Sequence, residues 1–267
     1  RVVTIKYYTR YKDSVSQRKV HPYGFLYGHR HYLVANNLRK GEEGIRMFSL
    51  PNISKVEVME EHFVRDEKFD LELDHSQTNP RVQRIKVPHK QHKVFAKASR
   101  NSMLLNVLQI LIGNNVRFRN SKLNIKAAKG GSEVDWHQDW ALYPHTNSDL
   151  LAVGIMLDDI DEDNAPLMVV PQSHLGKTLN HHYRGVFSGS VDLKEEEVDS
   201  STSYKITGKA GSASFHHVKA LHGSGTNQSD RPRRMLFFEY AAADAWPLVD
   251  FEVYGDFAEY EEKMVLG

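Results

Sequence analysis

The chain has 267 residues, of which 40% are hydrophobic and 26% charged, and its 35 Lys and Arg nearly balance its 34 Asp and Glu. These values are typical of a soluble protein of one or two domains, and they exclude a protein that acts chiefly as a polycation. The absence of cysteine excludes disulfides and thiolate metal sites, so any metal must be held by histidines and carboxylates. The longest apolar run, residues 150–157, is far shorter than the roughly 20 residues of a membrane helix.

The first part of the chain is basic and has the pattern of short strands. Residues 1–46 contain ten Lys or Arg against three acidic residues, so the remainder of the chain is acidic. Alternating β-branched and aromatic residues predict strands over residues 2–8, 18–27, 31–35, 45–50 and 53–60. Strands at this spacing predict a small β-barrel over residues 1–73. No helix-turn-helix pattern is present to read DNA.

The run HPYGFLYGHRHYLVANNLRKGEEGIRMFSLPNISKVEV, residues 21–58, resembles a WYL domain. That family is a small SH3-like or Sm-like β-barrel of bacterial transcription regulators, and the resemblance covers about residues 2–72. The naming motif falls on His31-Tyr32-Leu33, so its first aromatic residue is replaced by histidine. Ser49 and Asn52 stand where the family usually has arginines. The resemblance implies a surface that senses a ligand or nucleic acid, and a solvated barrel face is the alternative.

A second domain is expected over residues 99–267. Residues 74–98 are polar and predict a linker and lead-in. A helix follows, which Asn101 or Ser102 can cap and Gly113 ends; because it is apolar nearly all round, it should be well buried. Further strands are predicted over residues 116–127, 150–157, 212–218 and 233–240.

The pattern His137-x-Asp139 is the strongest chemical signal in the chain. On a strand, residues two apart point to the same side, so these two side chains can share one cation. A non-heme Fe(II) centre needs a second histidine, and His222, just after a predicted strand, is the best candidate. Arg233, eleven residues later, can bind a carboxylate beside the metal with its planar guanidinium. Alone, the His-x-Asp pattern is equally typical of a hydrogen-bonded surface pair.

Residues 136–174, WHQDWALYPHTNSDLLAVGIMLDDIDEDNAPLMVVPQSH, and 221–234, LHGSGTNQSDRPRR, resemble the phytanoyl-CoA dioxygenase family. Its members are Fe(II)- and 2-oxoglutarate-dependent oxygenases on a double-stranded β-helix, and the resemblance covers about residues 82–245. The residues that match its metal ligands are His137, Asp139 and His222. Those that match its 2-oxoglutarate ligands are Ser224 and Arg233, with Arg234 as the less favoured neighbour. Trp140, Tyr143 and Asn147 are expected to line the mouth of the substrate pocket, or simply to pack. The remaining nearby histidines, such as His216 and His217, are expected to be structural or solvent-exposed.

The sequence departs from this family in four places. Ala165 and Gln172 each replace a glycine, so turns that need a positive φ should be strained. Gly154 replaces a common tryptophan, which should enlarge the pocket or loosen it. The family's usual N-terminal buttress is missing, and the WYL-like segment stands in its place.

We therefore expect a mainly β protein with a double-stranded β-helix (jelly-roll or cupin-like) core, flanking helices and a small N-terminal barrel. The expected activity is Fe(II)- and 2-oxoglutarate-dependent hydroxylation, with O₂ as cosubstrate, of an unactivated C–H bond in a small or lipid-like metabolite. The alternatives are a non-catalytic sensor of a ligand or nucleic acid, or an inactive fusion of the two pieces.

The cellular context follows from the ends and composition of the chain. It begins with Arg1 and lacks a signal-peptide pattern, so we expect a cytoplasmic fragment or processed product without membrane contact. The sequence leaves open the substrate, the oxidative outcome and the oligomeric state.

Overall fold

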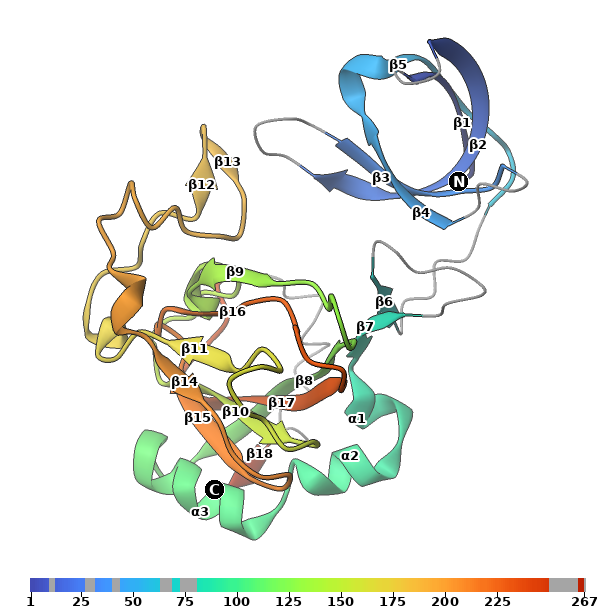
Figure 1. Cartoon of the computed structure of the whole chain (residues 1–267). Helices are drawn as coiled ribbons and strands as arrows, with labels where there is room; N and C mark the ends of the chain where they lie inside the picture. Colours follow the sequence, from blue (N-terminus) through green and yellow to red (C-terminus); the bar gives the residue numbers. More distant parts are fainter. Residues whose placement is uncertain are drawn as a thin grey trace. The chain divides into compact units, whose positions relative to one another are not determined.

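The computed structural model describes residues 1–9, 13–26, 32–39, 44–62, 69–72, 81–249 and 264–266 (Figure 1). The chain divides into two compact units, residues 1–82 and residues 83–267. Most of the regular structure is β-strand, as the sequence predicts. Within the described ranges, no helix has both the length and the apolarity to cross a membrane. His31, the first residue of the WYL naming motif, lies outside the described residues.

Unit 1 contains an antiparallel sheet with the strand order β4–β3–β2–β1–β5. Its strands are β1 (Val3–Thr9), β2 (Ser14–Leu26), β3 (Tyr32–Asn37), β4 (Gly44–Ser49) and β5 (Ile53–Val58), and β6 (Phe69–Leu71) follows. Alternate residues of the strands are buried in a small core of Val3, Ile5, Val20, Leu33, Ala35 and Phe48. The five predicted strands are thus confirmed, and closure of the sheet into a barrel stays a prediction.

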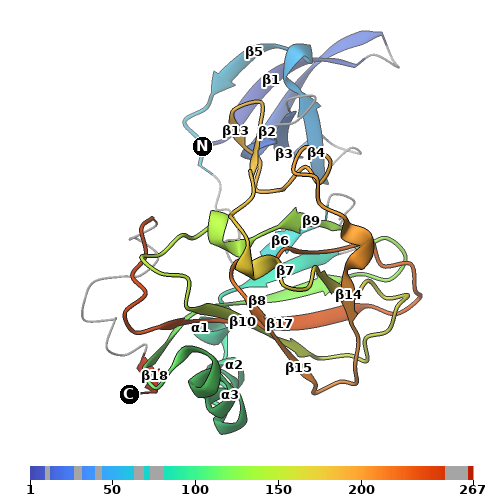
Figure 2. The ribbon, with the colours of Figure 1, turned by 90° about the vertical axis from the view of Figure 1, so that its left-hand side faces the viewer.

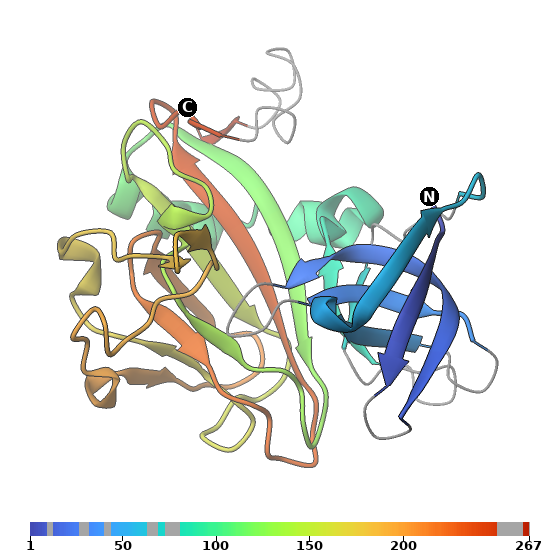
Figure 3. The same ribbon diagram turned by 90° about the horizontal axis from the view of Figure 1, so that it is seen from above.

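The larger sheet of unit 2 has the order β15–β10–β17–β8–β7, and β18 also pairs with β8. Its strands are β7 (Val82–Lys86), β8 (Val116–Lys126), β10 (Leu150–Met156), β15 (Ala213–His217), β17 (Arg233–Ala242) and β18 (Met264–Leu266). The long strands β8 and β17 run side by side in antiparallel register from Arg233 opposite Lys126 to Ala242 opposite Val116 (Figure 3). This pair forms the centre of the sheet.

Three helices cover one face of this sheet: α1 (Pro88–Gln91), α2 (Lys93–Ala98) and α3 (Ser102–Ile112) (Figure 2). Residues expected to form a lead-in therefore include β7, α1 and α2. As predicted, Asn101 caps α3 by accepting a hydrogen bond from the amide of Met103, and Gly113 ends the helix. The expectation that α3 is well buried is wrong, because Met103 and Ile110 are 75% and 83% exposed. Only one side of α3 packs on the sheet, through Leu105 and Leu108 among others.

The opposite face of the larger sheet is covered by a smaller sheet with the order β14–β11–β16–β9 (Figures 1 and 2). Its strands are β9 (Val134–His137), β11 (Leu167–Val169), β14 (Tyr204–Ile206) and β16 (His222–Ser224), and a separate hairpin joins β12 (His182–Tyr183) and β13 (Val186–Phe187). Side chains alternate across the larger sheet. Leu151, Val153, Leu236 and Phe238 belong to the core under the helices, so Ala152 and Phe237 point toward the smaller sheet.

Candidate metal centre and pocket

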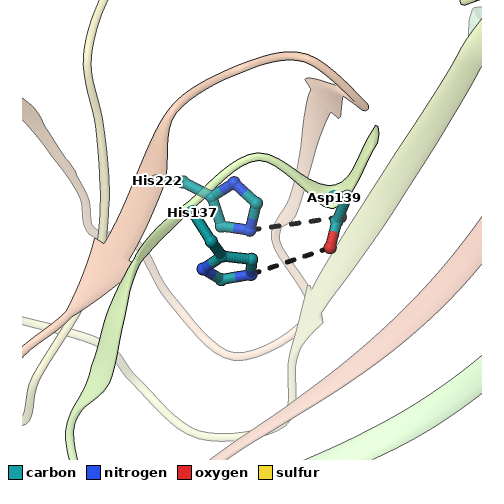
Figure 4. A group of neighbouring side chains, drawn as sticks. All are labelled: His137, Asp139 and His222. Atoms are coloured by element: carbon teal, nitrogen blue, oxygen red, sulfur yellow. Dashed lines mark ion pairs between the residues drawn. The ribbon is translucent and has the colours of Figure 1, made fainter. Parts of the chain in front are cut away.

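The three predicted metal ligands come together between the two sheets of unit 2 (Figure 4). Strands β9 and β16 pair in a register that sets His137 directly opposite His222, and the ring centroids are 4.2 Å apart. Asp139 begins the short 3-10 turn after β9 (Asp139–Ala141), and its carboxylate points toward both histidines. One ligand atom from each of the three residues lies within 4.8 Å of the other two.

Hydrogen bonds orient both imidazole rings. The Nδ1 atom of His137 lies 2.8 Å from the carbonyl oxygen of Asp135, and the Nδ1 atom of His222 lies 2.8 Å from that of Ala220. A carbonyl can only accept, so each Nδ1 carries the proton and each Nε2 keeps a lone pair for a metal. The Nε2 atoms of His137 and His222 lie 3.7 Å and 4.0 Å from the carboxylate of Asp139.

The electrostatics also suit a cation. Burial lowers the pKa of His137 and lowers that of His222 well below its usual value, so both rings are neutral near pH 7. Burial alone would raise the pKa of Asp139, but Lys122 and the neighbouring histidines hold that pKa well below its usual value. Its Oδ1 is buried and has no hydrogen-bond partner in the described part of the chain. Two neutral imidazoles and an ionised carboxylate that needs a partner fit a divalent iron ion.

Arg233 and Ser224 line the same pocket as the triad. Arg233 is only 2% exposed, and its Nε and Nη2 donate to the carbonyl of Ala165 at 3.1 Å and 2.6 Å. Burial lowers its pKa to about 10, so the side chain remains cationic at neutral pH. Arg234, its less favoured neighbour, instead faces outward, half-exposed, and pairs with Asp158. Arg233 and Arg234 are neighbours in the sequence, but only Arg233 faces the pocket.

Trp140, Tyr143 and Asn147 do not appear among the described residues that line this pocket. Trp140 and Tyr143 pack against a separate apolar cluster that includes Leu150, and the Arg119 guanidinium lies 3.9 Å from the centroid of the Tyr143 ring. Burial, with the nearby Asp139 carboxylate, raises the pKa of Tyr143 well above its usual value. A role for these three residues at the pocket mouth stays a prediction.

Sequence reasoning missed several polar side chains in the pocket. These are Arg84 from β7, Lys122, Asn124 and Lys126 from β8, and His216 from β15. Lys122, Asn124 and Lys126 are spaced two apart, so they share the inward face of β8. Three polar residues at alternate positions of a strand whose other face is apolar were the signal that could have identified them.

Two of the predicted departures have direct structural counterparts. Ala165 and Gln172, which replace glycines, have φ angles of 62° and 63°, as the expected strain requires. Gly154 does not enlarge the pocket, because a Cβ atom there would lie 2.5 Å from Cε of Met235 and 3.0 Å from Cε1 of Phe237. Neighbouring side chains already fill the space that a larger residue would take.

The family model described as Phytanoyl-CoA dioxygenase (PhyH) matches residues 53–235, and the WYL domain model matches residues 1–58. A relative named probable alpha-ketoglutarate-dependent hypophosphite dioxygenase, from Stutzerimonas stutzeri, is 39% identical over 206 residues, covering 76% of this chain and 71% of the relative. Ectoine dioxygenase from Bordetella bronchiseptica is 30% identical over 179 residues, covering 60% of this chain and 57% of the relative.

Solved structures agree with these sequence matches. EctD from S. alaskensis, crystallised with 2-oxoglutarate and 5-hydroxyectoine, matches with a TM-score of 0.57 at 25% identity, covering 67% of this chain and 62% of that chain. EctD has also been solved with bound Fe, and that structure matches with a TM-score of 0.56. Unit 2 therefore has the fold of the double-stranded β-helix oxygenases. Iron is its cofactor and 2-oxoglutarate its cosubstrate. With more than half of its length matched, the chain belongs to the phytanoyl-CoA dioxygenase family of Fe(II)- and 2-oxoglutarate-dependent dioxygenases.

Proposed function

We propose that this chain uses Fe(II), 2-oxoglutarate and O₂ to oxygenate a small, polar substrate. The observation that carries this proposal is that the donor triad and the buried guanidinium of Arg233 open into one pocket. Most of the residues that line this pocket are polar or charged, which favours a small polar substrate over a lipid-like one.

Each pocket residue has a distinct proposed role. His137, Asp139 and His222 hold the iron, and the hydrogen bonds at Nδ1 keep both rings in the orientation that presents Nε2. Arg233 binds the far carboxylate of 2-oxoglutarate, and Ser224 donates a hydrogen bond to the same group. When bound, iron couples the oxidative decarboxylation of 2-oxoglutarate to succinate with transfer of one oxygen atom to the substrate.

Two reactions are candidates for the oxygenation step. The hypophosphite dioxygenase that is 39% identical to this chain suggests oxidation of a P–H bond. The ectoine dioxygenases suggest hydroxylation of a C–H bond in a small metabolite, as expected from the sequence. Coupled turnover of 2-oxoglutarate with hypophosphite, and with ectoine in parallel, separates these two possibilities.

The proposal includes a two-domain organisation, with a WYL-like barrel over residues 1–73, a lead-in over 74–98 and the oxygenase over 99–267. The WYL domain match over residues 1–58 supports the first of these. The rival function, a non-catalytic sensor of nucleic acid through the basic front, requires salt-dependent binding to short oligonucleotides. Binding that is absent, or that does not depend on salt, contradicts the rival.

The decisive experiment combines ligand-induced stabilisation with turnover. Fe(II) and 2-oxoglutarate, added without oxygen, should raise the Tm of the full chain, and added O₂ should produce succinate. His137→Ala should abolish both responses, whereas His182→Ala, at an exposed position on β12, should retain them. A wild-type chain with neither a thermal shift nor succinate formation would contradict the proposed function.

A further inference from the structure

His216 is a buried pocket residue whose ring nitrogens make no hydrogen bond within the part of the chain that the structure describes. It is 6% exposed, and its Nε2 lies 3.8 Å from Oδ2 of Asp139, which is longer than a hydrogen bond. Its ring centroid lies 4.7 Å from that of His222, yet it is not part of the close-set triad. Within the described residues, neither of its ring nitrogens has a hydrogen-bond partner. An imidazole carries at least one N–H in every tautomer, so burial without a partner is unfavourable.

Lys122 lines the same pocket from strand β8. It lies directly opposite Phe237 in the β8–β17 register, with its Nζ 5.8 Å from the centroid of that ring. The His216 ring lies 6.2 Å from the same Phe237 ring, so both side chains lie beside it. Lys122 is also the strongest of the influences that lower the pKa of Asp139.

The charge of Lys122 is only partly balanced within the protein. Its Nζ lies 3.3 Å from Oε1 of Glu239, but that buried carboxylate also forms an ion pair with Arg119. Lys122 and Arg119 therefore share the Glu239 carboxylate, and the ammonium of Lys122 keeps the capacity to attract an anion in the pocket.

The charge of the whole pocket has the same sign. Four cationic side chains line it, from Arg84, Lys122, Lys126 and Arg233, against the single carboxylate of Asp139. Bound Fe(II) and the dianion 2-oxoglutarate cancel each other in charge. The cationic side chains of the pocket therefore still favour a second, smaller anion after both have bound.

We propose that Lys122 and His216 form a subsite for an anionic substrate, a small oxyanion whose oxygens accept hydrogen bonds from the ammonium and the imidazole. The inference rests on the proposed function and assigns the cosubstrate and the substrate to different cations, Arg233 and Lys122. A phosphorus oxyanion and a short carboxylate share this chemistry. Phe237 lies beside both donors and provides an apolar wall against which the non-polar part of the substrate packs.

The test measures substrate binding separately from cosubstrate binding. The full chain, loaded with Fe(II) and 2-oxoglutarate without oxygen, is titrated by calorimetry with hypophosphite, phosphite or acetate, and with zwitterionic ectoine as the non-anionic comparison. Lys122→Met should weaken binding of the preferred anion about tenfold or more, because a charge-assisted hydrogen bond is lost. His216→Phe should also weaken it, and His216→Gln, which keeps a donor, should restore part of the loss. Lys209→Met, at an exposed lysine outside the pocket, should bind as the wild type does.

The affinity for 2-oxoglutarate, measured in the same variants, keeps the interpretation unambiguous. It should stay within about twofold of the wild-type value, which also shows that each variant is folded. If the wild type binds 2-oxoglutarate but none of the anions, the subsite proposal is wrong and the proposed function stands. Equal losses of anion and 2-oxoglutarate in Lys122→Met would overturn it too, since Lys122 would then hold the cosubstrate. A wild type that binds no 2-oxoglutarate contradicts the proposed function itself.

Discussion

Arg233 offers the most direct test of how the pocket holds 2-oxoglutarate. Two of its guanidinium nitrogens donate to the Ala165 carbonyl, so Nη1 remains to meet a carboxylate entering the pocket. Truncating one partner of a buried, hydrogen-bonded charge pair costs about 2–5 kcal/mol. At about 1.4 kcal/mol per factor of ten, a loss near the middle of that range weakens 2-oxoglutarate binding by more than 100-fold. Arg233→Met should show this loss, and Arg233→Lys, which keeps the charge but not the fork, should lie in between.

The assay is an oxygen-free titration of the Fe(II)-loaded protein with 2-oxoglutarate, run well below the Tm because the variant also leaves the Ala165 carbonyl without its donors. Arg234→Met is the matched control. Its side chain is exposed and pairs with Asp158, so the change should alter stability by under about 1 kcal/mol and leave 2-oxoglutarate affinity unchanged. A folded Arg233→Met with wild-type affinity, or a loss confined to Arg234→Met, would refute the assignment.

Three further predictions concern stability. Burial above all lowers the pKa of His145 to about 4, so as pH falls below 6.5 the unfolded chain takes up a proton before the folded chain does. The free energy of unfolding should therefore drop by on the order of 2–3 kcal/mol by pH 4.5. In urea unfolding, His145→Gln should lack this part of the loss. Ala165→Gly and Gln172→Gly should each raise stability by up to about 1 kcal/mol by relieving left-handed strain, and a lower Tm would contradict this. Gly154→Ala should lower stability by about 1 kcal/mol, because its Cβ would lie 3.0 Å from both Cε1 of Phe237 and Oγ of Ser214 although the flexible Met235 side chain can move aside; unchanged unfolding would mean that these neighbours also yield.

The sequence predicted the five strands of the unit 1 sheet, the strands β8, β10, β15 and β17 of unit 2 and the limits of α3, because alternation, capping residues and glycine act locally. It also identified His137 and Asp139 as a pair, although the expectation that both lie on one strand is wrong, because β9 ends at His137 and Asp139 begins the 3-10 turn that follows. His222 was a candidate from its place after a predicted strand, and the family resemblance added support; no local pattern predicts the pairing of β9 with β16, because it depends on contacts far apart in the chain. Local patterns therefore predicted two of the three donors, His137 and Asp139, and the third was proposed from its place after a predicted strand and from motif similarity.

What the sequence could not predict depends mostly on strand register. Of the neighbours His216 and His217, only His216 lines the pocket, and of Arg233 and Arg234 only Arg233 does. A shift of one residue reverses such choices, and the register is set by pairing with β10 and β17. The exposure of one side of α3 could not be predicted either, because the apolar sequence of a helix does not determine how much of its surface the sheet covers.

Because His137 and His222 lie opposite each other on β9 and β16, a metal bound to both would also stabilise the pairing of these two strands. Strand β9 ends the smaller sheet, and it pairs only with β16 in the described strand order. An ion held by both histidines would act as a cross-link between two segments remote in sequence, in addition to the backbone ladder that joins them. Iron-starved protein should then fray from this edge, with β9 amides exchanging their hydrogens faster, so that loss of metal becomes a route to local unfolding and proteolysis.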